Sequence, residues 1–209
     1  SGKDAILSGP AGGVVGAVQT SKEAGLHKMI GFDMGGTSTD VTHYAGDYER
    51  SSESEVAGVP VRAPIMQIHT VAAGGGSICR FDGMRLRAGP ESAGARPGPA
   101  AYRCNGPLTI TDCNVLVGKI RPDYFPKLFG EDGTLALDEE IVCARFAALA
   151  QQVTEVTGRQ QSPEALAAGC EVAGKRPANQ ARKDDCAEQA NHTIALYDEH
   201  DGGGGHCSN

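Results

Sequence analysis

The sequence has 209 residues and lacks several features that mark whole classes of protein. It has no basic run and a formal net charge of -7, which argues against nucleic acid and an anionic membrane surface as partners. It has no signal peptide and no apolar run long enough to cross a bilayer, so we expect a cytoplasmic protein. It also has no initiator methionine, so we expect a processed product or a piece of a longer polypeptide.

The seven cysteines include no Cys-x-x-Cys pair, and their spacing is irregular. An odd number in this pattern argues against a disulfide framework and against a zinc ribbon. Reduced thiols in a cytosolic protein fit the pattern better. Cys79 and Cys113 have no histidine close by in the sequence, so we interpret them as small packed hydrophobic residues rather than nucleophiles.

Glycine, in contrast, is abundant. The 29 glycines are about twice the usual share, so many backbone positions need a positive φ or lie close to another group. Between the glycine-rich segments, apolar patterns predict a helix within residues 5–25, strands at 28–34 and 39–45, and a helix over 138–157 that Asp138 caps.

Two further helical segments are predicted in the second half of the chain. A short helix begins at Asp112, which we interpret as an N-cap rather than a catalytic residue. Another begins at Ser162, but Gly174 and Pro177 are expected to interrupt it, because an interior proline costs a helix about 3 kcal/mol. The following residues up to 209 are polar and glycine-rich and are expected to be flexible.

The segment GFDMGGTSTDV, residues 31–41, allows two interpretations. It is a tight hairpin if Gly35-Gly36 forms the turn between the two predicted strands. It is a phosphate cradle if the glycines let backbone N–H groups approach an anion and the hydroxyls of residues 37–39 donate to it. An aspartate lies beside phosphate only with a cation between them, so Asp33 and Asp40 would imply Mg²⁺ held mostly through water.

Other candidate residues have equally plain structural alternatives. His69 either orients a substrate or helps to bind a metal, or its ring nitrogens form hydrogen bonds with the local backbone. Gly74, Gly75 and Gly76 either contact a ligand or allow two elements to pack closely. Arg96 is the best candidate among the arginines to hold a substrate carboxylate through paired hydrogen bonds, although solvated or structural arginines are commoner.

Five blocks in this order resemble the hydantoinase A / 5-oxoprolinase family, and FPKLFGEDG (125–133) is similar to its 5-oxoprolinase branch. The blocks are SGPAGGVVGA (8–17), GFDMGGTSTDV (31–41), HTVAAGGGSI (69–78), GPESAGARPGPAAY (89–102) and LTITDCNVLVGKIRPDYF (108–125). The resemblance covers roughly residues 1–168. GFDMGGTSTDV in particular is similar to the phosphate loops of the sugar kinase, heat-shock protein and actin superfamily.

The resemblance implies an α/β fold of the actin-like ATPase (ribonuclease H-like) type, a mixed sheet with helices on its faces. Residues 1–168 would be the C-terminal part of the ATP-binding unit, and residues 169–209 a degenerate, flexible tail. Members of the family carry an earlier phosphate loop in a preceding domain, which is missing from this chain.

The resemblance also implies part of an ATP-dependent cyclic amidase, a 5-oxoprolinase or hydantoinase that phosphorylates the lactam oxygen and hydrolyses the ring amide. ATP and Mg²⁺ would be required, the substrate would be a small lactam or hydantoin, and a hydantoinase B-like subunit or domain is a plausible partner. The residues implied are Asp33, Asp40 and His69 for catalysis, Asp33 and Asp40 for Mg²⁺, Gly35, Gly36, Thr37, Ser38, Thr39, Gly74, Gly75 and Gly76 for phosphate, and Arg96 for substrate.

Two alternatives remain open from the sequence. The chain is a non-catalytic fragment or degenerate relative if its missing first loop and altered tail have removed activity. A sugar-kinase-like phosphotransferase shares the phosphate loop but leaves GPESAGARPGP and FPKLFG unexplained.

Overall fold

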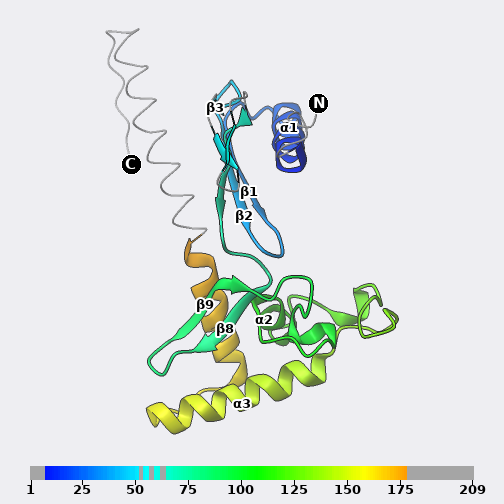
Figure 1. The fold of residues 1–209 in the computed structure, drawn as a ribbon, viewed down its shortest axis with the longest axis vertical. Coiled ribbons are helices and arrows are strands. Elements are labelled where there is room, and N and C mark those ends of the chain that lie inside the picture. Colours follow the sequence, from blue (N-terminus) through cyan, green and yellow to red (C-terminus); the bar gives the residue numbers. More distant parts are fainter. Residues whose placement is uncertain (1–7, 52–53, 57–58, 62–64, 178–209) are drawn as a thin grey trace.

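The structure is a computed structural model that describes residues 8–51, 54–56, 59–61 and 65–177. Its helices and strands form two groups along the chain. One group contains the first helix and the first seven strands, and the other contains the last two strands and the remaining helices (Figure 1). No helix in the described part of the chain combines the length and the apolar character that a membrane span requires.

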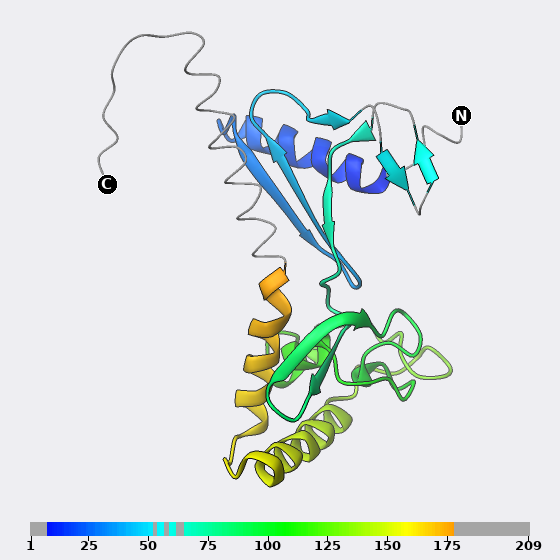
Figure 2. The same ribbon diagram turned by 60° about the vertical axis from the view of Figure 1, so that its left-hand side comes forward.

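The first group is a three-stranded antiparallel sheet with a helix on one face. Strands β1 (Met29–Met34), β2 (Thr39–Tyr44) and β7 (His69–Val71) pair in the order β1-β2-β7. The predicted strand–turn–strand pattern around Gly35-Gly36 is therefore confirmed. Helix α1 (Ser8–Glu23) lies along this hairpin, and the tip of the hairpin points toward the second group (Figure 2).

The helix is held on the sheet by a small apolar cluster. Val14 and Val18 of α1 and Tyr44 of β2 are buried together, with Met29 and Ile68 packed at the edge. Lys22 Nζ lies 5.1 Å above the ring of Tyr44, which adds a cation–π contact. These contacts hold the end of the hairpin that is opposite the turn. The turn itself extends toward the second group.

Three short antiparallel pairs complete the strands. They are β3 (Arg50–Ser51) with β6 (Ile65–Met66), β4 (Ser54–Val56) with β5 (Val59–Val61), and β8 (Ser77–Phe81) with β9 (Leu86–Ser92). Every strand pair among the described residues is antiparallel, so the parallel pairing expected of a mixed sheet does not occur among them.

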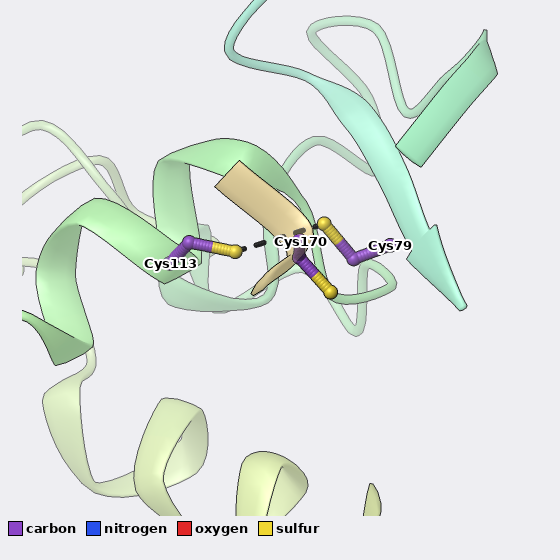
Figure 3. Close-up of side chains that lie close together, drawn as sticks. All are labelled: Cys79, Cys113 and Cys170. Atoms are coloured by element: carbon purple, nitrogen blue, oxygen red, sulfur yellow. Dashed lines mark hydrogen bonds between the residues drawn. The ribbon is translucent and has the colours of Figure 1, made fainter. Parts of the chain in front are cut away.

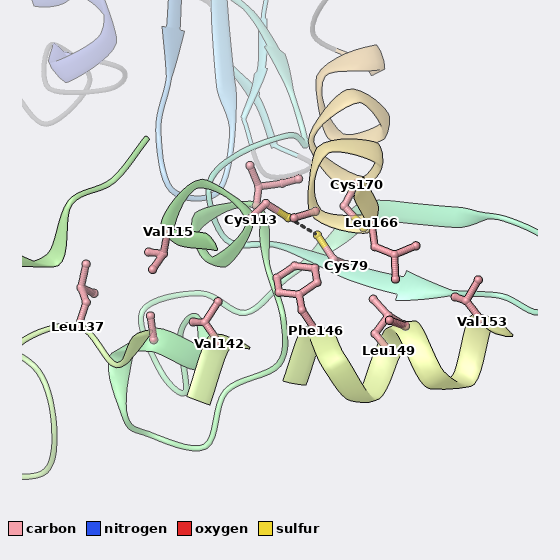
Figure 4. Close-up of a cluster of buried hydrophobic side chains, with 14 residues drawn as sticks. Cys79, Cys113, Val115, Leu137, Val142, Phe146, Leu149, Val153, Leu166 and Cys170 are labelled. Atoms are coloured by element: carbon pink, nitrogen blue, oxygen red, sulfur yellow. Dashed lines mark hydrogen bonds between the residues drawn. The ribbon is translucent and has the colours of Figure 1, made fainter. Parts of the chain in front are cut away.

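The second group contains the larger core, which α3 (Glu139–Thr157) covers from below in Figure 4. Asp138 caps this helix as predicted, since its Oδ1 accepts from the N–H of Ile141 at 3.1 Å. The helix buries Val142, Phe146 and Val153, three members of the predicted apolar face, against β8 and the other helices.

A fully buried carboxylate organises the start of α2 (Ile110–Leu116). The N-cap is Thr109, and Asp112 is the third residue of a capping box, so the N-cap predicted at Asp112 was placed three residues too late. Asp112 accepts four hydrogen bonds: from the N–H and hydroxyl of Thr109 at 2.8 and 2.9 Å, and from the N–H groups of Ala100 and Ala101 at 3.1 and 2.8 Å. It therefore joins α2 to the 3₁₀ helix η2 (Ala100–Tyr102), which confirms a structural role.

Burial raises the pKa of the Asp112 carboxyl, although the hydrogen bonds from Ala101 and Thr109 oppose that rise. A second 3₁₀ helix, η3 (Pro122–Tyr124), begins the connection to α3. Tyr102 and Phe129 stack in this region, with ring centroids 4.5 Å apart.

The helix that begins after Ser162 runs without interruption from residue 163 to 177, contrary to the predicted break. The Ser162 hydroxyl caps it by accepting from the N–H of Ala165 at 3.2 Å. Gly174 does not end the helix but allows it to pack closely, because a Cβ there would lie 2.6 Å from Ile110 Cδ1. The domain boundary predicted after residue 168 thus falls inside a packed helix.

Residues on both sides of that boundary are buried. Leu166, Ala167 and Cys170 are fully buried in the larger core, and Glu171 next to them accepts hydrogen bonds from Lys119 and Lys175. The predicted flexible tail beyond residue 177 lies outside the described residues.

The Glu171 ion pairs predict a pH-dependent contribution to stability. Lys119, and then Lys175, lower the pKa of the Glu171 carboxyl from its usual 4.5, so the stabilisation is present above pH 4.5 and is lost as the pH falls through the lowered pKa. We expect Glu171→Gln to lower the free energy of unfolding at pH 7 by about 1 kcal/mol, because solvent screens the half-exposed lysines. Urea unfolding followed by circular dichroism at pH 7 and pH 3 measures this.

The matched control is Glu131→Gln, at an exposed turn position, which should leave stability unchanged at both pH values. A Glu171→Gln chain that is as stable as the wild type at pH 7 would contradict a stabilising role for the ion pairs of Glu171 with Lys119 and Lys175.

Candidate functional site

The tip of the β1–β2 hairpin is a four-residue turn from Gly35 to Ser38. The turn is closed by the N–H of Gly35, which donates to the Ser38 carbonyl at 2.8 Å. Within the part of the chain that the structure describes, the N–H groups of Gly36, Thr37 and Ser38 have no protein acceptor. The hydroxyls of Thr37 and Ser38 likewise have no protein partner there, and Gly36 and Thr37 are exposed. The tip therefore presents donors that are available to an anion.

Two carboxylates lie just behind the tip. Asp33 and Asp40 are directly opposite each other in the β1–β2 register, so their side chains share one face of the sheet. Thr70 of β7 is opposite Asp40 on the same face and donates its hydroxyl to Asp40 Oδ1 at 2.7 Å. Asp33 is exposed, and Asp40 is partly buried. Two carboxylates on one face beside a row of donors suit a hydrated divalent cation next to a phosphate.

His69 does not join this pair. It lies opposite Val41, so its side chain is on the other face of the sheet from Asp33 and Asp40. The catalytic set that the sequence predicted is therefore divided between two faces, and only the carboxylates come together in this structure.

Thr39 also differs from its predicted role in phosphate binding. Its side chain is fully buried, and its hydroxyl donates to the carbonyl of Ala73 at 2.6 Å. Because a threonine hydroxyl has one proton to donate, this bond removes Thr39 from the phosphate donors. Thr39 instead fixes the segment that follows β7.

Gly74, Gly75 and Gly76 of that segment, which we call the glycine loop, pack directly against the hairpin tip. Gly75 and Gly76 donate their N–H groups to the carbonyls of Gly35 and Gly36 at 3.0 and 2.6 Å. A Cβ at Gly74 would lie 2.7 Å from the Gly36 carbonyl carbon and oxygen and from the Thr37 nitrogen. Of the two alternatives for residues 74–76, the structure therefore favours close packing over direct contact with a ligand.

Two more of the five quoted sequence blocks, residues 89–102 and 108–125, meet at the same loop. Thr111, at the start of α2, donates both its N–H and its hydroxyl to the Gly75 carbonyl, at 2.8 and 3.0 Å. Ala93, after β9, donates its N–H to the Gly76 carbonyl at 2.8 Å. Thr111 was not predicted from the sequence, although it lies within one of the five quoted blocks. No local pattern distinguishes a hydroxyl that supports a loop from any other hydroxyl.

Arg96 lies on the turn that Ala93 anchors. Its side chain is exposed, and within the described residues it has no ion-pair partner. Arg80 and Arg87 instead pair with Glu91 and Asp82 on the β8–β9 hairpin, which agrees with a structural interpretation for them. Arg96 is thus the arginine that remains available to a ligand beside the glycine loop.

Three buried cysteines also come together, in the larger core (Figure 3). The sulfur atoms of Cys79 and Cys113 are 3.7 Å apart, and those of all three, with Cys170, lie within 4.8 Å of one another. The thiol partner and burial raise the pKa of Cys79. Cys79 and Cys113 are packed residues, as predicted, but their meeting with Cys170 was not foreseen, because the three come from separate elements.

The chain matches known proteins along most of its length. The Hydantoinase/oxoprolinase family model matches residues 1–187. 5-Oxoprolinase 1 of Arabidopsis thaliana is 43% identical over 208 residues, which are 94% of this chain and 16% of that protein. 5-Oxoprolinase of Saccharomyces cerevisiae is 46% identical over 171 residues, 81% of this chain and 13% of that protein. The chain thus spans about one sixth or less of the length of these relatives.

Two solved structures resemble this one. A nucleotide-free structure of acetone carboxylase has a TM-score of 0.62 at 31% identity and covers 78% of this chain and 22% of its own. The ATP-dependent caprolactamase from Pseudomonas jessenii has a TM-score of 0.57 at 31% identity and covers 73% of this chain and 21% of its own. The predicted α/β fold of the actin-like ATPase type is confirmed by these likenesses.

The packing of the glycine loop against the hairpin tip predicts that Gly74→Ala is destabilising. The added methyl group would meet backbone atoms of Gly36 and Thr37, which cannot rotate away, so we expect the free energy of unfolding to fall by about 1–3 kcal/mol. Gly16→Ala in α1 is the control, since a Cβ there meets nothing within 4 Å and alanine favours a helix. Urea unfolding of both variants compares them, and equal stability of the two would refute the close approach.

Proposed function

The chain belongs to the hydantoinase/oxoprolinase family, and we propose that it is the part of an ATP-dependent cyclic amidase that binds the phosphates of ATP. The observation that carries the proposal is the hairpin tip, where three backbone N–H groups with no acceptor among the described residues lie beside Asp33 and Asp40. The cyclic amide is 5-oxoproline in our proposal, since 5-oxoprolinases of Arabidopsis and yeast are among the relatives.

Hydrolysis of a cyclic amide needs activation, because the amide carbonyl is a poor electrophile. ATP, when bound, would supply a phosphoryl group to the lactam oxygen and so activate the carbonyl carbon. Water would add to that carbon, the ring C–N bond would break as the nitrogen takes a proton, and a second water would release phosphate from the acyl phosphate to leave the carboxylate. The protein's task is to position the reactants and to neutralise charge on the phosphates.

The residues of the tip fit this task in distinct ways. The N–H groups of Gly36, Thr37 and Ser38, with the hydroxyls of Thr37 and Ser38, would donate to phosphate oxygens. Asp33 and Asp40 would hold Mg²⁺ through water, and Thr70 orients Asp40. The donor set therefore suits a magnesium phosphate better than a free phosphate, whose charge the two carboxylates would repel.

The surrounding segments support the tip or face the substrate. Gly35 closes the turn, and Gly74, Gly75 and Gly76 hold it from behind. Arg96, exposed on an anchored turn, would bind the carboxylate of the substrate through paired hydrogen bonds. His69 faces away from the carboxylates, so our proposal gives it no part in holding the metal.

Because the chain is a small part of its relatives' length, the remaining parts of the active site would come from elsewhere. We propose that a domain with an earlier phosphate loop faces this tip and completes the site, and that a hydantoinase B-like subunit or domain joins them.

The two carboxylates predict that nucleotide binding depends on Mg²⁺. Calorimetric titration of this chain should give a higher affinity for ATP with Mg²⁺ than without it. Asp40→Asn should lower the affinity for Mg²⁺-ATP by about tenfold or more, because asparagine keeps an acceptor for Thr70 but carries no charge for the cation. Asp132→Asn, at an exposed turn, is the control. An Asp40→Asn chain that keeps the full Mg²⁺ dependence would refute the metal role.

The proposed reaction can be tested by grafting. This chain alone should not turn over ATP, whereas a yeast 5-oxoprolinase whose matching segment is replaced by this chain should hydrolyse ATP when 5-oxoproline is present. Asp40→Asn in the graft should lower that rate about a hundredfold or more, and Asp132→Asn should not. A folded graft that binds Mg²⁺-ATP but lacks 5-oxoproline-dependent turnover would overturn the assigned substrate.

A further inference from the structure

We propose that Cys79, Cys113 and Cys170 form a binding site for one thiol-binding metal ion, either Zn²⁺ or Cu⁺. Both ions have a filled d shell and bind thiolate ligands well. The proposal does not depend on the function proposed above, since the cluster lies in the larger core, which includes none of the proposed phosphate donors.

The geometry of the cluster suits a shared ion. Cys79 comes from β8, Cys113 from α2 and Cys170 from the helix over residues 163–177, so three separate elements bring sulfur to one point (Figure 3). Thiolates bound to one zinc ion at about 2.3 Å lie about 3.8 Å apart in a tetrahedral site. The sulfur atoms of Cys79 and Cys113, 3.7 Å apart, already have that spacing. The sulfur of Cys170 lies within 4.8 Å of both, so a small shift of this atom would complete a three-thiolate site.

The surroundings explain why an ion would stabilise these residues. All three side chains are buried in an apolar core that also contains Ile110, Phe146 and Leu166. A lone thiolate is costly in such a place. An ion that binds there makes three metal–sulfur bonds, and each thiol that enters the site protonated gives up its proton to water. The cation then offsets the thiolate charge that the core itself leaves uncompensated.

The distribution of the cysteines supports the same inference. Of the five cysteines in the described part of the chain, the three buried ones form the cluster, while Cys104 and Cys143 are exposed and separate. Filling an apolar core requires no sulfur, whereas three thiols facing one another form a ligand set for a soft metal.

The site would also stiffen the base of the glycine loop. Cys79 lies two residues after Ser77, whose hydroxyl accepts from the Gly74 N–H at 3.1 Å. Cys113 lies two residues after Thr111, which donates twice to Gly75. An ion that joins β8 to α2 would therefore fix both supports of this loop at once.

The experiment uses the complete chain with its four other cysteines, at positions 104, 143, 186 and 207, replaced by serine. Competition with a coloured chelator measures Zn²⁺ affinity, and anaerobic competition with a Cu⁺-specific chelator measures Cu⁺ affinity. We expect one ion per chain, an affinity that rises with pH because protons compete for the sulfurs, and a melting temperature that rises with the concentration of the preferred ion.

Cys170→Ala in that background should lower the affinity for the preferred ion at least about tenfold. Cys113→Ser provides a second test if the alanine variant does not fold, and circular dichroism of the metal-free chains shows which variants are folded. The natural chain with only Cys104→Ser and Cys143→Ser should bind as tightly as the natural chain itself. The proposal is overturned if the four-serine chain binds neither ion, or if folded Cys170→Ala binds as tightly as its parent.

Discussion

The close approach of two backbone segments holds the candidate site together. The hairpin tip accepts hydrogen bonds from Gly75 and Gly76 at 3.0 and 2.6 Å, and Gly74 leaves no room for a side chain. Thr39, Thr111 and Ala93 add hydrogen bonds to the same segment, at the carbonyls of Ala73, Gly75 and Gly76. The three glycines thus support the shape of the phosphate-binding turn without providing its donors.

Local patterns predicted local structure well. The β1–β2 hairpin and α3 were found from apolar periodicity and from Asp138, because these signals lie within a few residues of one another. The helix after Ser162 was cut short because Gly174 and Pro177 usually break helices. Here Gly174 is favoured by packing against Ile110, which is far away in the sequence and invisible to any local rule.

The site itself was predicted only in part. The hairpin that holds Asp33, Asp40 and residues 35–38 was predicted, since a tight turn brings both strands of the motif together, while the roles of these residues in binding stay predictions. Thr39 was grouped with them by proximity in the sequence, and His69 by the family resemblance. Alternation along the strands buries Thr39 and turns His69 to the opposite face. The thiol cluster joins positions 34 or more residues apart, so spacing carried no signal for it.

The Gly35 and Gly36 carbonyls, which accept hydrogen bonds at the hairpin tip, determine the direction of the electric field there. A trans peptide group points its N–H away from its carbonyl. Since the Gly35 and Gly36 carbonyls face the glycine loop, the amide protons of Gly36 and Thr37 face outward. The turn is thus a pair of oriented dipoles with their positive ends exposed, and this attraction for an anion contains no group that titrates near neutral pH.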